Sequence, residues 1–119
     1  KKRKVAFLMI TRTYFINYRS VSAHYDRPVP SCPHGSCGIV ERPDCILLVS
    51  YTTVCGDLTN DGWLTPCHYS SVTTAKHINA FIKDYVRAAD PTFDYKKWKK
   101  LVDKNVSYNI HTGEIKEIT

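Results

Sequence analysis

Apolar residues recur at helical spacing in the second half of the chain. They occupy positions i, i+3, i+4, i+7, i+8 and i+11, namely Ile78, Phe81, Ile82, Tyr85, Val86 and Ala89. Such a stripe is typical of a helix that packs on a sheet. Ser71 or Thr73 is suited to cap the N-terminus of this helix. The pair Asp90-Pro91 ends it, because the proline ring disfavours helical geometry at the preceding residue.

The residues before this helix favour β-strands. Residues 45–55 give the strongest strand signal, an apolar run followed by residues of high β propensity, and we expect this strand to be central. Residues 6–15 and 20–25 predict two earlier strands. Turn-forming residues at 56–62 predict a hairpin that leads into Trp63.

A second helix and two closing strands are predicted after residue 90. The helix covers residues 94–104 and points three apolar residues inward, Trp98, Leu101 and Val102. Residues 107–110 and 114–118 predict strands on either side of a turn. The order of elements predicts an α+β fold, a small antiparallel sheet with two helices packed on one face.

The length of the chain suits one domain, which we place at residues 6–119. Residues 26–44 hold four of the six prolines and two of the five glycines, and we expect a long loop there. Apolar residues make up 43% of the chain, and the longest apolar run is far too short to span a membrane. We therefore expect a soluble protein without membrane contact.

The positive charge is concentrated at the N-terminus. The formal net charge is +6, and four residues supply +4 of it: Lys1, Lys2, Arg3 and Lys4. Residues 1–5 resemble the nuclear import signal of the simian virus large T antigen. This resemblance implies an import tag that directs the chain to the nucleus of animal cells, and a native basic arm remains the alternative.

Five cysteines, an odd number without regular spacing, predict reduced thiols and not a disulfide framework. Cys32, His34 and Cys37 offer zinc ligands at short spacing. Three other residues could complete the tetrahedron: Cys45, Cys67 and His68. A loop whose thiols bind nothing is the alternative, and we expect the purified protein to hold less than one equivalent of zinc and no cofactor.

No catalytic pattern stands out. The chain lacks the His-x-Glu and Pro-Cys-x-x-Cys motifs of zinc deaminases and the glycine patterns of nucleotide-binding loops. Cys67 and His68 are neighbours, and neighbours on a strand point to opposite faces. Asp57 and Asp61 are assigned to a turn. These observations predict that the protein is not an enzyme.

Basic residues follow one side of each predicted helix. The second helix carries Lys96, Lys97, Lys100 and Lys104, flanked by Lys99. The first helix carries Lys76, Lys83 and Arg87 at i, i+7 and i+11. Such a surface is either a solvated outer face or a contact for phosphate groups or an acidic protein groove. We take these residues as the candidate partner-binding site.

Residues 69–81 and 108–114 resemble a small bacteriophage domain of unknown function. The likeness runs from about residue 46 to residue 114 and does not extend to the expected loop at 26–44. The resemblance implies no catalytic residue. It is consistent with a protein that acts by binding.

A phage-like domain joined to an import-like N-terminus leads us to expect an anti-CRISPR protein, because phage proteins are sent to animal nuclei chiefly to control genome editing. We expect a non-catalytic inhibitor that binds an RNA-guided Cas nuclease or its guide RNA complex, on the protein or on the RNA backbone, in the cytoplasm of the infected bacterium. A phage regulator that binds nucleic acid directly is the first alternative. A zinc-binding module built on Cys32, His34 and Cys37 is the second.

Overall fold

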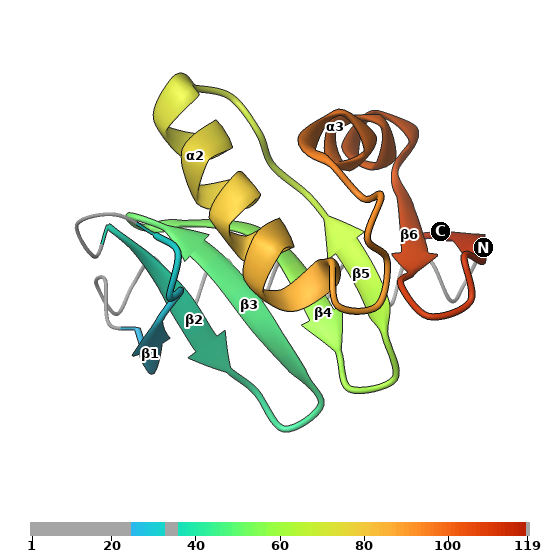
Figure 1. The fold of residues 1–119 in the computed structure, drawn as a ribbon, viewed down its shortest axis with the longest axis horizontal. Helices are drawn as coiled ribbons and strands as arrows, with labels where there is room; N and C mark the ends of the chain where they lie inside the picture. The colour runs from blue at the N-terminus through green and yellow to red at the C-terminus, as the bar shows by residue number, and fades with distance from the viewer. Residues whose placement is uncertain (1–24, 33–35, 119) are drawn as a thin grey trace.

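We describe residues 25–32 and 36–118 of the computed structural model (Figure 1). Seven strands form one antiparallel sheet in which each strand pairs with the next along the chain. The strands are β1 (Arg27–Pro28), β2 (Cys37–Glu41), β3 (Cys45–Ser50), β4 (Thr53–Thr59), β5 (Trp63–Pro66), β6 (Val106–Asn109) and β7 (Ile115–Glu117). Helices α2 (Val72–Phe81) and α3 (Tyr95–Lys104) pack against the sheet, so the predicted α+β class is confirmed.

The expected single strand over residues 45–55 is wrong, because the chain reverses at Tyr51 and Thr52 between β3 and β4. Tyr51 has a φ of 55°, a left-handed conformation that is costly for a residue with a side chain. Two hydrogen bonds from distant residues hold it: Tyr51 N donates to Ser36 O at 2.9 Å, and Tyr25 Oη donates to Tyr51 O at 3.0 Å. The turn is therefore fixed by tertiary contacts and not by turn-forming residues.

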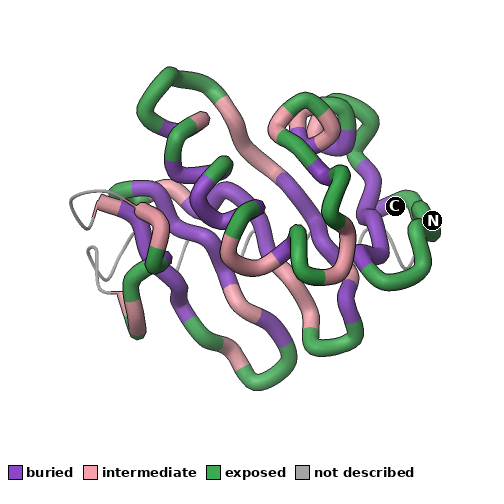
Figure 2. The backbone as a smooth tube through the Cα atoms, in the orientation of Figure 1, coloured by how far each residue is buried: buried purple, intermediate pink, exposed green. Residues whose placement is uncertain are grey.

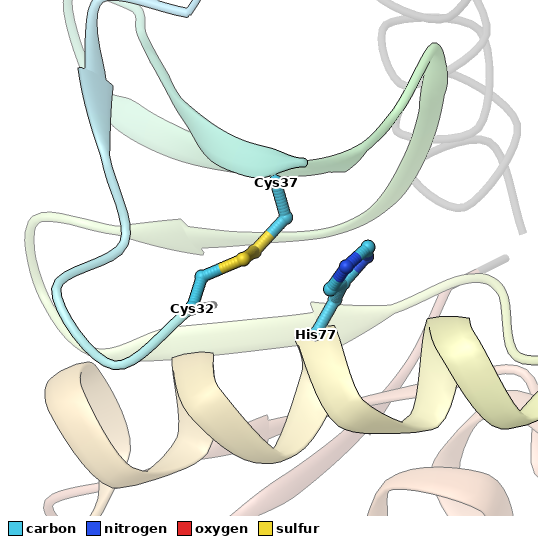
Figure 3. A group of neighbouring side chains, drawn as sticks. All are labelled: Cys32, Cys37 and His77. Atoms are coloured by element: carbon cyan, nitrogen blue, oxygen red, sulfur yellow. A yellow bond between two sulfur atoms is a disulfide. The ribbon is translucent and has the colours of Figure 1, made fainter. Parts of the chain in front are cut away.

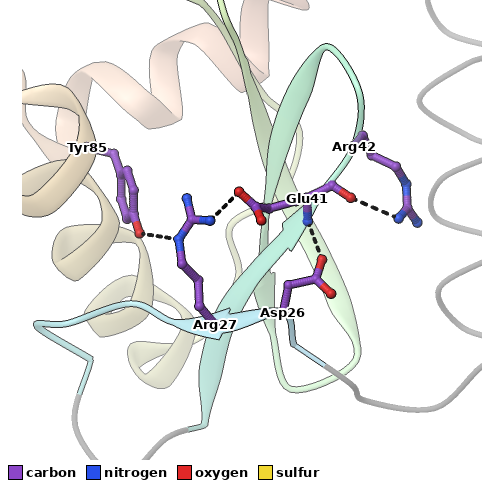
Figure 4. A network of polar contacts seen from close by, with 5 residues as sticks. All are labelled: Asp26, Arg27, Glu41, Arg42 and Tyr85. Carbon is purple, nitrogen blue, oxygen red and sulfur yellow. Dashed lines mark hydrogen bonds and ion pairs between the residues drawn. The ribbon is translucent and has the colours of Figure 1, made fainter.

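The expected loop at 26–44 contains two strands, β1 and β2, and that prediction is wrong there. Pro28 lies in the edge strand β1, where a missing backbone donor is tolerated. Gly38 lies in β2 because the ring of Tyr25 packs on its backbone, where a Cβ would come within 2.3 Å of the ring. Arg27 connects this edge to the helices, since its guanidinium contacts both Glu41 and the hydroxyl of Tyr85 (Figure 4). The strands expected before residue 25 lie outside the described residues.

Helix α2 begins at Ser71, one of its two predicted caps, and α3 is capped by Asp94, the first residue of its predicted range. Ser71 Oγ accepts a hydrogen bond from Thr74 N, and Asp94 Oδ1 accepts one from Lys97 N at 2.9 Å. Helix α2 continues into a π-helical turn, η2 (Ile82–Val86). None of the helices in the described part of the chain is long and apolar enough to cross a lipid bilayer.

The main core lies between the helices and one face of the sheet (Figure 2). Its largest side chains are fully buried: Trp98, Phe81, Phe93, Ile39, Leu48, Leu64, Ile78 and Ile82. A smaller apolar cluster comprises Val40, Cys45, Leu47, Val49 and Val54. Because side chains alternate along a strand, Leu48 belongs to the first cluster and its neighbours Leu47 and Val49 to the second.

Truncation of a buried residue on α2 tests this packing. Phe81→Ala removes a ring that is 0% exposed and should lower the free energy of unfolding by about 3–5 kcal/mol. Val72→Ala, at a position on the same helix that is 76% exposed, is the matched control and should change it by less than about 0.5 kcal/mol. Urea denaturation followed by circular dichroism measures both. Equal effects of the two substitutions would contradict the placement of α2.

Candidate functional site

A basic pocket lies beside helix α2 and turn η2. Its volume is about 430 Å³, and its lining residues are Ser31, Lys76, Asn79, Ala80, Lys83 and Arg87. Three of the seven cations singled out from the sequence therefore share one concave site. The pocket takes its remaining polar groups from an amide and a hydroxyl.

Two local features bring these cations together. Lys76 lies in α2, Lys83 lies in η2 and Arg87 follows η2 directly, so one continuous helical segment carries all three. The chain then forms the π-helical turn, in which Arg87 N donates to Ile82 O at 3.0 Å. Such widened turns recur at functional sites in other proteins.

Ser31 reaches the pocket through a contact that the sequence did not predict. Its backbone N and its Oγ donate to the two carboxylate oxygens of Asp84, at 2.7 and 2.6 Å. This double hydrogen bond joins the segment before β2 to η2. The wall of the pocket is therefore shared by segments that are 53 residues apart in the chain.

No carboxylate lines the pocket, and both oxygens of Asp84 are occupied by Ser31. Within residues 25–32 and 36–118, the one ion pair joins Arg27 and Glu41. Arg87 Nε donates to Phe93 O at 3.0 Å, which anchors one edge of its guanidinium. The lining of the pocket therefore holds three cations and no carboxylate, and the negative charge of Asp84 lies behind Ser31.

The lysines of α3 lie outside the pocket lining. Lys96, Lys100 and Lys104 are exposed. Lys97 instead packs its Nζ over the ring of Tyr108, 4.0 Å from the ring centroid, and Lys99 packs over Tyr95 at 5.0 Å. Of the basic residues predicted on α3, Lys96, Lys100 and Lys104 are therefore exposed to a partner. Their contact with a partner remains a prediction.

The cysteines of the expected zinc site form a second cluster. Cys32 and Cys37 are joined as a disulfide, in contrast to the reduced thiols expected from the sequence. His77 of α2 lies beside them (Figure 3), and one ligand atom from each of the three residues lies within 4.8 Å of the others. His34 falls outside the described residues. The residues expected to complete the site, Cys45, Cys67 and His68, are not part of this cluster.

Sequence reasoning missed His77, although a signal was present. His77 lies four residues before Phe81 and next to Ile78, so the helical period places it on the inner face of α2. The structure buries it, with 2% of its surface exposed, and burial lowers its pKa. Ser50 Oγ lies 2.6 Å from Nδ1, and Ser36 Oγ lies 2.9 Å from Nε2.

Asp57 is a buried carboxyl on strand β4, and its expected position in a turn is wrong. It lies between Leu47 and Thr65 of the adjacent strands. Its Oδ1 has no hydrogen-bond partner. Burial raises the pKa of Asp57 to about 7. The carboxyl group therefore keeps its proton below this pH, which avoids a buried charge without a partner.

The three remaining cysteines do not show the features of activated nucleophiles. Burial raises the pKa of Cys45 and of Cys55 to about 12, and it raises the pKa of Cys67 well above the ordinary value. Cys67 Sγ contacts Val54 O at 3.8 Å. Its neighbour His68 contacts Ser70 Oγ at 3.1 Å through Nε2. The structure therefore does not bring these two residues together as a thiol and its base.

A family of unknown function, DUF8033, matches residues 10–100. The chain belongs to this family. No curated protein and no solved structure matches it.

The DUF8033 match covers both candidate sites and extends over most of α3. It differs in extent from the likeness expected over residues 46–114, since it includes the segment 26–44 and ends before β6. The family description assigns no activity.

The pH dependence of folding tests the buried state of Asp57. Its pKa rises from 3.8 in the unfolded chain to about 7 in the folded one, so the folded chain keeps a proton that the unfolded chain releases. The resulting stabilisation is complete below about pH 4 and is lost as the pH rises to about 7. We expect Asp57→Asn to remove this dependence. From pH 4 to pH 7 the free energy of unfolding of the wild type should then fall by on the order of a few kcal/mol relative to that of the variant.

Urea denaturation at a series of pH values measures the difference. Glu117→Gln changes an exposed carboxyl on β7 and is the matched control, which should follow the wild-type profile. Parallel profiles for wild type and Asp57→Asn would show that the carboxyl is not buried as described.

Proposed function

We propose that this protein is a non-catalytic binding protein that docks on the phosphate backbone of a nucleic acid. The observation that carries the proposal is the pocket in which Lys76, Lys83 and Arg87 converge without a carboxylate. Phosphate contacts of this kind supply affinity and set orientation without reading base sequence.

The chemistry of the lining suits phosphate oxygens. Two ammonium groups and a guanidinium provide charge, and the guanidinium can bind two oxygens at once. Asn79 adds an amide donor beside them. The side chains of Lys76 and Lys83 make no hydrogen bond or ion pair within residues 25–32 and 36–118, so a ligand would not have to displace an internal partner.

The more specific form of the proposal is an anti-CRISPR inhibitor that binds the guide RNA complex of a Cas nuclease. Its support is the resemblance of residues 69–81 and 108–114 to a bacteriophage domain, together with the import-like residues 1–5. Mimicry of DNA would need a strongly acidic surface, whereas the chain after Lys4 carries a net charge of +2. We therefore propose that the pocket contacts guide RNA phosphates, and contact with an acidic surface of the nuclease is the alternative.

Charge reversal in the pocket tests the phosphate contact. The triple variant Lys76→Glu, Lys83→Glu and Arg87→Glu should bind fluorescein-labelled single-stranded RNA at least roughly tenfold more weakly at low salt. If three phosphates are contacted, the slope of log K against log[salt] should become less steep by about two in the variant, because each contact in a single strand contributes about 0.7 to its magnitude. Fluorescence anisotropy at several salt concentrations measures both quantities.

The exposed lysines of α3 provide the matched control. The variant Lys96→Glu, Lys100→Glu and Lys104→Glu changes the net charge by the same amount on a different helix. It should retain more affinity than the pocket variant and a steeper salt dependence. Equal losses would assign binding to overall charge, and a larger loss in the α3 variant would move the contact to that helix.

Inhibition of target cleavage tests the specific partner. Guide-loaded Cas nucleases of several types, each incubated with the purified chain, should include at least one whose cleavage of target DNA is blocked. Removal of residues 1–4 should leave this inhibition intact in the test tube, because an import signal acts only through its receptor. Binding to RNA without inhibition of any nuclease would favour the phage regulator, as would loss of binding after the truncation.

A further inference from the structure

Cys32, Cys37 and His77 bring three soft or borderline metal ligands to one point beside α2 (Figure 3). The two sulfur atoms and one imidazole nitrogen lie within 4.8 Å of one another. Cys37 and His77 are buried, and Cys32 is half-buried. Thiolate and imidazole groups are the ligands that zinc sites use most often in proteins.

The two cysteines are positioned by contacts other than their own bond. Ser31, before Cys32, is held by the double hydrogen bond to Asp84. Ser36, before Cys37, is held by its hydroxyl contact with His77 and by its carbonyl, which accepts hydrogen bonds from Tyr51 N and Tyr25 Oη. Reduction of the disulfide would therefore leave both sulfur atoms near the imidazole.

His77 already has the surroundings of a metal-binding histidine. Ser50 Oγ, on strand β3, lies 2.6 Å from Nδ1 and can accept a hydrogen bond from the Nδ1–H group. Metal-bound histidines use such a partner on the second nitrogen to fix the ring. The other nitrogen, Nε2, contacts the hydroxyl of Ser36 at 2.9 Å, a contact that a metal ion would replace.

We infer that Cys32, Cys37 and His77 form a redox-gated zinc site, which binds Zn²⁺ when the disulfide is reduced and excludes it when the disulfide forms. A thiol reductant supplies two electrons and two protons, which convert the disulfide into two thiols while two reductant thiols become a disulfide. Binding of Zn²⁺ to the two thiols then releases two protons as both become thiolates. Three protein ligands leave the fourth position of the tetrahedron to water or to another ligand.

Geometry makes the two states mutually exclusive. Disulfide sulfurs are about 2.05 Å apart, whereas two thiolates on one tetrahedral zinc, each about 2.3 Å from the metal, are roughly 3.8 Å apart. The Cα atoms of Cys32 and Cys37 are 6.3 Å apart, a separation that suits the disulfide. The change therefore requires the sulfurs to move apart by rotation of their side chains.

Titration of the full chain with Zn²⁺, with and without prior reduction, tests the inference. The reduced chain should bind one equivalent, and the oxidised chain should bind at least roughly a hundredfold more weakly because both thiolates are lost. Co²⁺ as a probe should give thiolate-to-metal charge transfer and the absorption of a tetrahedral site in the reduced chain alone. Absence of metal binding after reduction, or equal binding in both states, would overturn the inference.

Variants identify the ligands. Cys37→Ser and His77→Asn should each weaken Zn²⁺ binding to the reduced chain by at least about tenfold, and Ser50→Ala should do so by about tenfold through the loss of support for the ring. His77→Asn keeps a hydrogen-bonding side chain, and circular dichroism checks that each variant folds. If His77→Asn does not fold, the Zn²⁺ affinity of reduced Ser50→Ala tests whether His77 is a ligand.

Two histidine substitutions serve as controls. His68→Ala changes a half-buried histidine outside the cluster and should leave the affinity unchanged. His34→Ala should also leave it within about threefold, since His77 supplies the imidazole. A loss of binding in His34→Ala together with unchanged binding in His77→Asn would return the site to the ligand set first expected from the sequence.

Discussion

Trp98 lies where the two helices meet the sheet. Its ring packs over Gly56 of β4, where an added Cβ would come within 3.0 Å of the ring, and lies edge-on to Phe81 with the centroids 6.1 Å apart. Its Nε1 donates to His68 O at 3.2 Å, in the segment between β5 and α2. These contacts join α3, α2 and the sheet through one side chain. The position of α2, and with it the basic pocket, depends on this packing because a close-packed interior does not shift one element alone.

The basic pocket and the cysteine cluster meet at one segment of the chain. Ser31 lines the pocket, and its neighbour Cys32 belongs to the cluster. Asp84 holds Ser31 in place through hydrogen bonds to both of its carboxylate oxygens. Helix α2 serves both sites, with Lys76 in the pocket and the adjacent His77 turned toward the sheet. Phosphate binding in the pocket and metal binding at the cysteine cluster would therefore both depend on the contact between α2 and the first strands of the sheet.

Local signals predicted the helices and the closing strands well. Ser71 caps the first helix as predicted, the second helix begins where its range was predicted, and the closing hairpin lies where alternation and a turn signal placed it. The reversal at Tyr51 was not predictable, since no glycine, asparagine or aspartate marks it and its hydrogen bonds come from distant residues. Asp57 was misplaced for a related reason. Its neighbours favour a turn, but pairing with β3 and β5 extends the strand through it and buries the carboxyl.

The sequence by itself determined which cations share a side of the first helix. Lys76, Lys83 and Arg87 converge because helical geometry depends on residues close together in the chain. Only the tertiary structure decided which other groups join them. Ser31 contacts Asp84 across 53 residues, and Ser36 contacts His77 across 41. These approaches are set by the register of β2 on β3 and by the docking of α2 on the sheet, and neither is encoded in local spacing, because long-range contacts depend on how the whole core packs.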